Sequence, residues 1–268
     1  MIHTKKILLL SALLITAAAP REPMIIRHDV DPSKYFAEAS DYPSLFGLYI
    51  MGNGAPVCVA TIINESWAIT AAHCTQSERL QNQIASGEGY SVTVNGKPML
   101  LDGITHHPTW TGRANSTTFD MALLHFKTPV SDITPIDIYR DTDEVGKVVS
   151  MLGWGGTGTG LTGVKGNDAQ FRYAENLVDA ANDIWIDWDF DNPEENPDKV
   201  LPLEGISGPG DSGGPAFIKV GDSFKIAGIS SHQITRGQPE GSYGVTERYT
   251  RVSSAVEWIE STINSCVH

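Results

Sequence analysis

The sequence has few cysteines, few basic residues and no long hydrophobic run after its N-terminal segment. Only three of its 268 residues are cysteine, so burial of a core must stabilise the fold without a disulfide framework. Lys and Arg number 19 against 32 Asp and Glu, which gives a formal net charge of −13. A surface this acidic repels DNA and anionic membranes, which argues against nucleic-acid binding. A transmembrane helix needs about 20 apolar residues in succession, and no later stretch supplies them.

The first residues have the pattern of a secretory signal peptide. Lys5 and Lys6 precede the short apolar run Ile7–Ile15, and small residues follow at positions 17–19. We therefore predict a signal peptide over residues 1–19 and a secreted or periplasmic protein without stable membrane association. An uncleaved membrane anchor is the alternative, and the shortness of the apolar run disfavours it. Pro20 disfavours cleavage directly before it, so the exact cut stays open.

The rest of the chain is punctuated by 26 Gly and 15 Pro, which predicts many short elements. Residues 20–41 are polar and irregular, and we interpret them as an N-terminal extension or the start of the mature chain. Residues 42–265 form the predicted main domain. Asn95-Gly96 is the strongest hairpin signal, and residues 254–263 predict one closing helix with Val256, Ile259 and Ile263 on its apolar face. This pattern indicates an all-β barrel architecture. The strands are predicted at residues 45–51, 58–63, 67–70, 91–94, 99–104, 121–126, 148–152, 226–230 and 248–252.

A glycine-rich segment around Ser212 has the composition of a nucleophile loop. It reads Gly-Pro-Gly-Asp-Ser-Gly-Gly-Pro over residues 208–215. A serine hydroxyl becomes a useful nucleophile when a base takes its proton and donors face the developing oxyanion. Glycines let the backbone turn sharply and present its N–H groups there. By itself the segment is also compatible with an ordinary loop.

Two further segments supply a base and an acid. His73 follows Thr-Ala-Ala and precedes Cys74, at the end of a predicted strand. Asp120 stands between Phe119 and Met121 at the head of an apolar strand, which suggests burial. A buried carboxylate needs a partner, and an imidazole N–H would satisfy it and fix the tautomer. Taken singly, the histidine and the acid are each compatible with ordinary surface or capping roles.

Together the three segments resemble the hallmark motifs of the chymotrypsin-like serine proteases, in the family's order His, Asp, Ser. Gly153-Trp154-Gly155 and the C-terminal helix match that family too, and the resemblance covers roughly residues 42–263. It implies two six-stranded antiparallel β-barrels packed together with a C-terminal α-helix. It also implies a serine endopeptidase acting on protein or peptide substrates. We expect a monomer without cofactor or metal.

The same resemblance implies roles for individual residues. His73, Asp120 and Ser212 would form the catalytic triad, and the N–H groups of Gly210 and Ser212 the oxyanion hole. Ser231 matches the serine that hydrogen-bonds the buried acid. Cys58 and Cys74 match the disulfide that braces the histidine loop, which would leave Cys266 unpaired.

The sequence departs from the family at its start. Family members are usually cut before an Ile/Val-Val-Gly-Gly start, and the new amino group pairs with the acid beside the nucleophile, here Asp211. This chain has Ile25-Ile26-Arg27 near the expected place but lacks the glycines. Either processing exposes Ile25 or Ile26, or Asp211 finds another cation. We hypothesise that no dedicated activating protease is needed.

The substrate pocket departs from the trypsin pattern as well. Ile206 stands six residues before Ser212, where trypsin-like members carry the Asp that binds Arg or Lys. The pocket therefore favours apolar or small side chains, although Glu247 on the opposite wall would restore some preference for a cation. His232 stands where the family commonly has Trp. The expected substrate-binding residues are Ile206, Ser207, Ser231, His232 and Glu247.

Three alternatives remain beside this interpretation. Asp187, Asp189 and Asp191 have the spacing of early calcium-loop ligands, but their alternation with apolar residues favours a strand with one wet face. A lipase-type nucleophile elbow needs a helix after Ser212 and a histidine downstream of it. The segment 215–218 predicts a strand instead, so a serine esterase is disfavoured. A non-catalytic binding protein on a protease scaffold is the third alternative.

Overall fold

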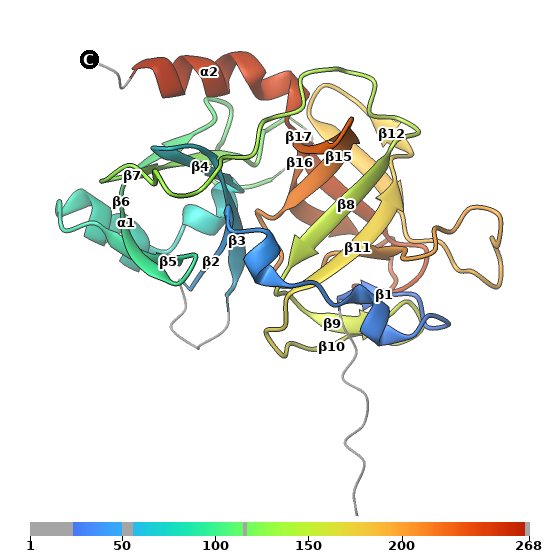
Figure 1. The fold of residues 1–268 in the computed structure, drawn as a ribbon. Coiled ribbons are helices and arrows are strands. Elements are labelled where there is room, and N and C mark those ends of the chain that lie inside the picture. Colours follow the sequence, from blue (N-terminus) through green and yellow to red (C-terminus); the bar gives the residue numbers. More distant parts are fainter. Residues whose placement is uncertain (1–23, 50–55, 115–116, 266–268) are drawn as a thin grey trace, which may run out of the picture.

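A computed structural model describes residues 24–49, 56–114 and 117–265 of the chain. The strands form two barrel-like sheets that lie side by side, with a helix across one end (Figure 1). This is the all-β, two-barrel fold with a closing helix that the resemblance implied. Among the described residues no helix is long and apolar enough to cross a membrane.

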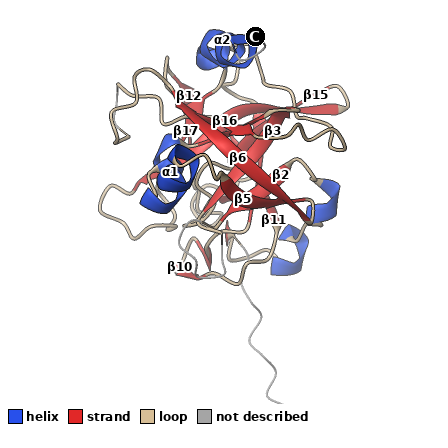
Figure 2. Ribbon diagram, turned by 90° about the vertical axis from the view of Figure 1, so that its left-hand side faces the viewer, coloured by secondary structure: helices blue, strands red, loops and turns tan. Residues whose placement is uncertain are grey.

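The first barrel is a six-stranded antiparallel sheet in the order β2-β3-β4-β7-β6-β5, with β2 also lying against β5. Asn95 and Gly96 both have positive φ, at 45° and 75°, so they form the predicted tight hairpin turn. Helix α1 (Glu78–Ala85) packs outside β5 and β6 and was not predicted (Figure 2). The strands are β2 (Leu45–Leu48), β3 (Cys58–Asn64), β4 (Trp67–Thr70), β5 (Tyr90–Val94), β6 (Lys97–His106) and β7 (Ala122–Phe126).

The second barrel is more open and has seven strands in the order β11-β8-β15-β16-β17-β13-β12, all antiparallel. The strand beyond the expected six is β12 (Ala180–Ala181), a two-residue edge that pairs with β13. The others are β8 (Val148–Gly153), β11 (Arg172–Leu177), β13 (Trp185–Asp189), β15 (Pro215–Val220), β16 (Ser223–Ile234) and β17 (Thr246–Arg251).

A small third sheet joins the N-terminal segment to the second barrel. Strand β1 (Ile25–Ile26) lies between β9 (Thr157–Thr159) and β14 (Gly205–Ile206), and β10 (Gly163–Gly166) pairs with β9. The segment 20–41 was expected to be irregular, yet Met24, Ile25 and Ile26 are buried. These apolar residues find backbone partners on both sides of β1, which a scan for longer periodic runs misses.

The closing helix α2 (Val256–Ser265) follows a 3-10 turn at Ser253–Ala255. Ile259 is buried in the same apolar cluster as residues of the first barrel, and the Trp258 ring packs edge-on against His107 at 5.0 Å. The helix therefore ties the end of the chain back onto the first barrel.

Candidate active site

The histidine is carried by the turn that ends β4. Ala71 and Ala72 are fully buried, and His73 follows them in a 3-10 turn over Ala72–Thr75. Its backbone N–H donates to Asp120 Oδ1 at 2.9 Å, and its Nδ1 lies 2.7 Å from Asp120 Oδ2. Because an ionised carboxylate only accepts, Nδ1 is the nitrogen that donates to Asp120, and Nε2 is the ring nitrogen turned to other partners.

The acid is buried between the two barrels. Asp120 precedes β7, is 0% exposed, and accepts a third hydrogen bond from Ser231 Oγ on β16 at 2.7 Å. Its carbonyl accepts from Thr250 Oγ1 on β17 at 3.1 Å. Burial on its own would raise the pKa of Asp120, but the hydrogen bonds from His73 and Ser231 hold this pKa below its ordinary value. Donors from both barrels, His73 first and Ser231 second, thus favour the ionised form of this acid.

The loop of Ser212 is clamped from both barrels. The Ser212 carbonyl accepts from Val59 N–H on β3 at 2.7 Å, and Gly213 N–H donates to Ser230 on β16 at 2.9 Å. Gly213 has φ +77°, and a Cβ there would lie 2.2 Å from Thr70 Oγ1. Only glycine fits this position, which explains the residue after the serine.

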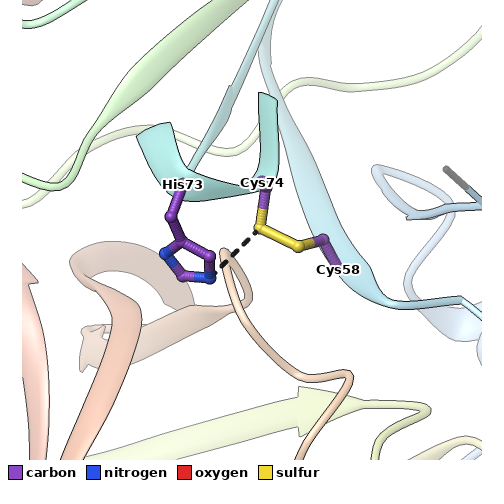
Figure 3. Close-up of side chains that lie close together, drawn as sticks. All are labelled: Cys58, His73 and Cys74. Atoms are coloured by element: carbon purple, nitrogen blue, oxygen red, sulfur yellow. Dashed lines mark hydrogen bonds between the residues drawn. A yellow bond between two sulfur atoms is a disulfide. The ribbon is translucent and has the colours of Figure 1, made fainter. Parts of the chain in front are cut away.

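The Ser212 loop is linked through β3 to the turn that carries His73. Val59, which holds Ser212, is next to Cys58, and Cys58 forms a disulfide with Cys74 beside His73 (Figure 3). His73 Nε2 lies 3.7 Å from Cys74 Sγ. Within the described part of the chain, Ser212 Oγ makes no hydrogen bond to His73. In enzymes without a ligand, the hydrogen bond between a nucleophile and its base is often long and tightens when substrate binds.

A hydrogen bond fixes the peptide between Pro209 and Gly210, whose N–H is one of the two predicted oxyanion donors. The Pro209 carbonyl accepts from Gly156 N–H at 2.8 Å, and a planar trans peptide then directs the Gly210 N–H the opposite way. Gly210 has φ +106°, in the region that favours glycine. In the part of the chain that the structure describes, neither Gly210 nor Ser212 donates its N–H to a backbone carbonyl.

Asp211, beside the serine, is held by backbone donors. Its two oxygens accept from Gly155 N–H at 2.7 Å and Gly208 N–H at 2.9 Å. Burial raises the pKa of Asp211 to about 6, although both N–H groups favour the ionised form. A Cβ at Gly153 would lie 2.0 Å from its Oδ1, and one at Gly155 2.4 Å from its Cγ. Gly153-Trp154-Gly155 therefore makes room for this carboxylate, a role that sequence reasoning missed.

A small cavity of about 40 Å³ opens beside Ser212. Of the expected substrate-binding residues, Ser207, Ser231, His232 and Glu247 line it. Ile206 does not: its side chain is fully buried in the apolar cluster beneath, because neighbouring residues of a strand point to opposite faces. The other lining residues are Gly208, Pro209, Ser230, Gln233 and Glu240. Sequence reasoning did not single out Gln233 or Glu240, because neither belongs to a recognisable local motif.

His232 lines this cavity and contacts Ser231, the residue that donates to Asp120. Its Nδ1 is 3.0 Å from Ser231 Oγ, and its ring packs edge-on against Trp185 at 5.4 Å. Burial lowers the pKa of His232, so the ring is neutral at physiological pH.

The disulfide Cys58–Cys74 confirms the pairing implied by the family resemblance. Cys58, His73 and Cys74 place three potential ligand atoms within 4.8 Å of one another, but disulfide sulfurs are not thiolates and do not bind metal in this state. Cys266 lies outside the described residues.

The acidic segment forms the predicted strand with one wet face. In β13, Ile186 and Trp188 are buried, whereas Asp187 pairs with Arg248 at 2.6 Å. Asp189 accepts from Thr246 Oγ1 at 2.5 Å. Pro215–Val220 is strand β15, as predicted, rather than the helix that a lipase-type elbow requires.

Comparisons with known proteins agree with this architecture. A family model described as Trypsin matches residues 34–259. Phenoloxidase-activating factor 3 of Holotrichia diomphalia is 27% identical over 233 residues, which cover 77% of this chain and 64% of that protein. Chymotrypsin-like elastase family member 1 of Macaca fascicularis is 24% identical over 241 residues, covering 85% and 88%. Urokinase-type plasminogen activator of Gallus gallus is 25% identical over 260 residues, covering 87% and 59%. The chain therefore spans less than two thirds of two of these relatives.

Proposed function

This chain belongs to the trypsin family, and from that membership we propose that it is a serine endopeptidase with His73, Asp120 and Ser212 as its triad. The observation that carries the proposal is the pair of half-buried His73 and fully buried Asp120, bonded at 2.7 Å and anchored from the second barrel by Ser231. A merely structural histidine has no need of an acid held by donors from both barrels.

The proposed reaction starts with attack of Ser212 Oγ on the substrate carbonyl carbon while His73 Nε2 takes the hydroxyl proton. The carbonyl electrons move to oxygen, where the N–H groups of Gly210 and Ser212 stabilise the negative charge. Collapse of this intermediate breaks the C–N bond, and His73 gives its proton to the leaving amine. Water then hydrolyses the acyl-enzyme with His73 again as base. Asp120 orients the ring throughout.

A fluorophosphonate probe tests the proposal directly. The purified wild type should label at Ser212 and hydrolyse a mixed peptide library, whereas Ser212→Ala should lose all labelling. Hydrolysis by Ser212→Ala should fall by about 10⁴-fold or more, since the triad acts as a unit. Ser91→Ala, on the exposed face of β5, is the matched control and should behave as wild type.

Two other results would contradict the proposal. A folded wild type without labelling or hydrolysis would favour a non-catalytic binding protein on this scaffold. Labelling with hydrolysis of esters but of no peptide would favour a serine esterase.

We further propose that the protein is exported, with residues 1–19 removed as a signal peptide, and acts on protein substrates as a monomer. The disulfide Cys58–Cys74 supports an oxidising destination. Cell fractionation with N-terminal sequencing of the mature protein tests the cut, and sedimentation tests the monomer.

A further inference from the structure

The size and charge of the cavity beside Ser212 indicate which substrate side chain it accepts. This inference rests on the proposed function, a serine endopeptidase. In a serine protease such a cavity takes P1, the side chain of the residue whose carbonyl is attacked. A water needs about 10–15 Å³ of such volume, so about 40 Å³ holds only a few heavy atoms. The cavity is too small for a phenylalanine, lysine or arginine side chain.

Gln233 makes the cavity small. Its Nε2 donates to the Ser207 carbonyl at 2.9 Å, and its Oε1 accepts from Gly241 N–H at 2.9 Å. Ser207 leads into the nucleophile loop, whereas Gly241 follows Glu240 on the loop between β16 and β17. Both ends of the amide are engaged, so the side chain joins two walls of the cavity and is fixed there.

Glu247 lies in the same cavity and has an unused oxygen. It is 1% exposed, its Oε1 accepts from Ser207 Oγ, and its Oε2 is buried with no hydrogen-bond partner among the described residues. A buried oxygen without a hydrogen-bond partner costs free energy. A hydrogen bond from a substrate donor to Oε2 would therefore stabilise the complex more than a hydrogen bond to an oxygen that water already solvates.

The groups that face Glu247 make this cavity acidic. Burial raises the pKa of Glu247 to about 8; Ser207 and Gln233 oppose that rise, while the charges of Asp211 and Glu240 add to it. Burial raises the pKa of Tyr249 on the same strand and lowers the pKa of His232 on β16, so both side chains stay neutral and neither offsets an acid. No Lys or Arg is among the described residues that line the cavity. A substrate cation that reached Glu247 would therefore pair with it and release its proton.

We propose that Gln233 is a strap across an acidic specificity pocket, which restricts P1 to small side chains such as Ala, Ser and Thr. Glu247 is a cation site that the strap keeps out of reach, so removing the strap changes the preferred P1 residue to lysine or arginine.

The test measures kcat/KM on peptides that differ only at P1, as Ala, Thr, Phe or Lys. For the wild type, Ala and Thr should exceed Phe and Lys by about 100-fold, the scale at which a closed pocket discriminates by size. Gln233→Gly should raise cleavage after Lys by about 100-fold, and more than cleavage after Phe. Gln233→Ala, which changes the strand backbone less, should act in the same direction. Adding Glu247→Gln to Gln233→Gly should remove the gain for Lys but keep the gain for Phe.

Controls separate this inference from the proposed function. Gln238→Gly, an exposed glutamine on the same loop, should leave the P1 profile unchanged. Every variant is labelled with the fluorophosphonate and melted, so loss of the fold or of the nucleophile is seen independently of P1. A labelled wild type that cleaves after Lys as well as after Ala overturns the strap alone. So does a folded, labelled Gln233→Gly with an unchanged profile, or a gain for Lys that survives Glu247→Gln. A folded wild type that neither labels nor cleaves overturns the proposed function and the strap with it.

Discussion

At the scale of single residues, the site is governed by three buried carboxylates in different surroundings. Asp120 has donors from His73 and Ser231, and its pKa is lowered. Asp211 has two backbone donors, and its pKa is raised to about 6. Glu247 keeps one oxygen unpartnered, and its pKa is raised furthest, to about 8. The order follows how well hydrogen bonds replace the water that burial removes.

Glu247 should make stability depend on pH. Its ordinary pKa is 4.5, and in the folded state it is about 8, so between these values the folded chain binds more protons than the unfolded chain. Stability from this group is therefore complete below about pH 4.5 and is lost as pH rises through 8. Glu247→Gln keeps an acceptor for Ser207 but never ionises. The difference in melting temperature between this variant and the wild type should therefore grow in the variant's favour by about 5 °C or more from pH 5 to pH 9. The scale follows because about 1 kcal/mol of stability corresponds to about 2–4 °C in a protein of this size.

The comparison is made by calorimetry at a series of pH values, with exposed Glu88→Gln as the control for loss of one negative charge. Using the difference between variant and wild type cancels the contribution of other titrating groups. A Glu247→Gln curve parallel to wild type would show that Glu247 is already ionised, or fully solvated, at neutral pH.

The residues whose contacts were predicted correctly stand in short local motifs. His73, Asp120 and Ser231 each belong to such a segment, and their neighbours in sequence indicate burial. Gln233 was not foreseen, because its function depends on Ser207 and Gly241, which approach it only in the folded chain. Similarly, Ile206 was expected in the pocket from its spacing to Ser212. Side chains of successive residues point in opposite directions here, so Ser207 lines the cavity and Ile206 lies in the core.

At the scale of elements, the sequence pattern predicted most of the longer strands and α2 but missed α1, β11 and β1. Helix α1 has only Leu80 fully buried among its residues, so its apolar stripe is too thin to recognise. Strand β1 has two residues and depends entirely on β9 and β14. The disulfide Cys58–Cys74 likewise fixes a short element, because it ties the turn that carries His73 to β3.

Removing that disulfide should affect both stability and activity. Cys58 and Cys74 are 16 residues apart, and closing a loop of this length stabilises by about 3 kcal/mol. The double variant Cys58→Ser/Cys74→Ser should therefore melt about 6–12 °C lower. Hydrolysis measured well below the melting point should also fall, because the turn that holds His73 loses its brace. Thermal melts with and without reductant check this. Cys266→Ser is the control. A double variant with the same melting temperature as this control and the wild type would refute the bracing role of the disulfide.

At the scale of the whole molecule, hydrogen bonds at the site join the two barrels. The N-terminal strand β1 pairs with β9 and β14, which belong to the second half of the chain. Family resemblance predicted the two barrels because the three motifs specify them jointly. It did not predict how Asp211 is satisfied, because the usual glycine start is missing from the chain. Here the Asp211 carboxylate accepts hydrogen bonds from the N–H groups of Gly155 and Gly208. Ile25 instead pairs as a strand residue with Ile206 on one side and Gly158 on the other.

This arrangement predicts activity without a dedicated activating cut. A chain of residues 20–268 kept intact should label with the fluorophosphonate and hydrolyse peptides at the same rate as one beginning at Met24. A chain beginning at Arg27 loses the fully buried Ile25 and Ile26, each worth about 1.5–3 kcal/mol of burial. It should melt about 10 °C lower and lose activity, since β1 no longer supports the loops around Asp211. Mass spectrometry of each preparation confirms its N-terminus before assay. An inert 20–268 chain that becomes active only after cleavage near Ile25 would mean that Asp211 needs the new amino group, and that the backbone donors are not sufficient.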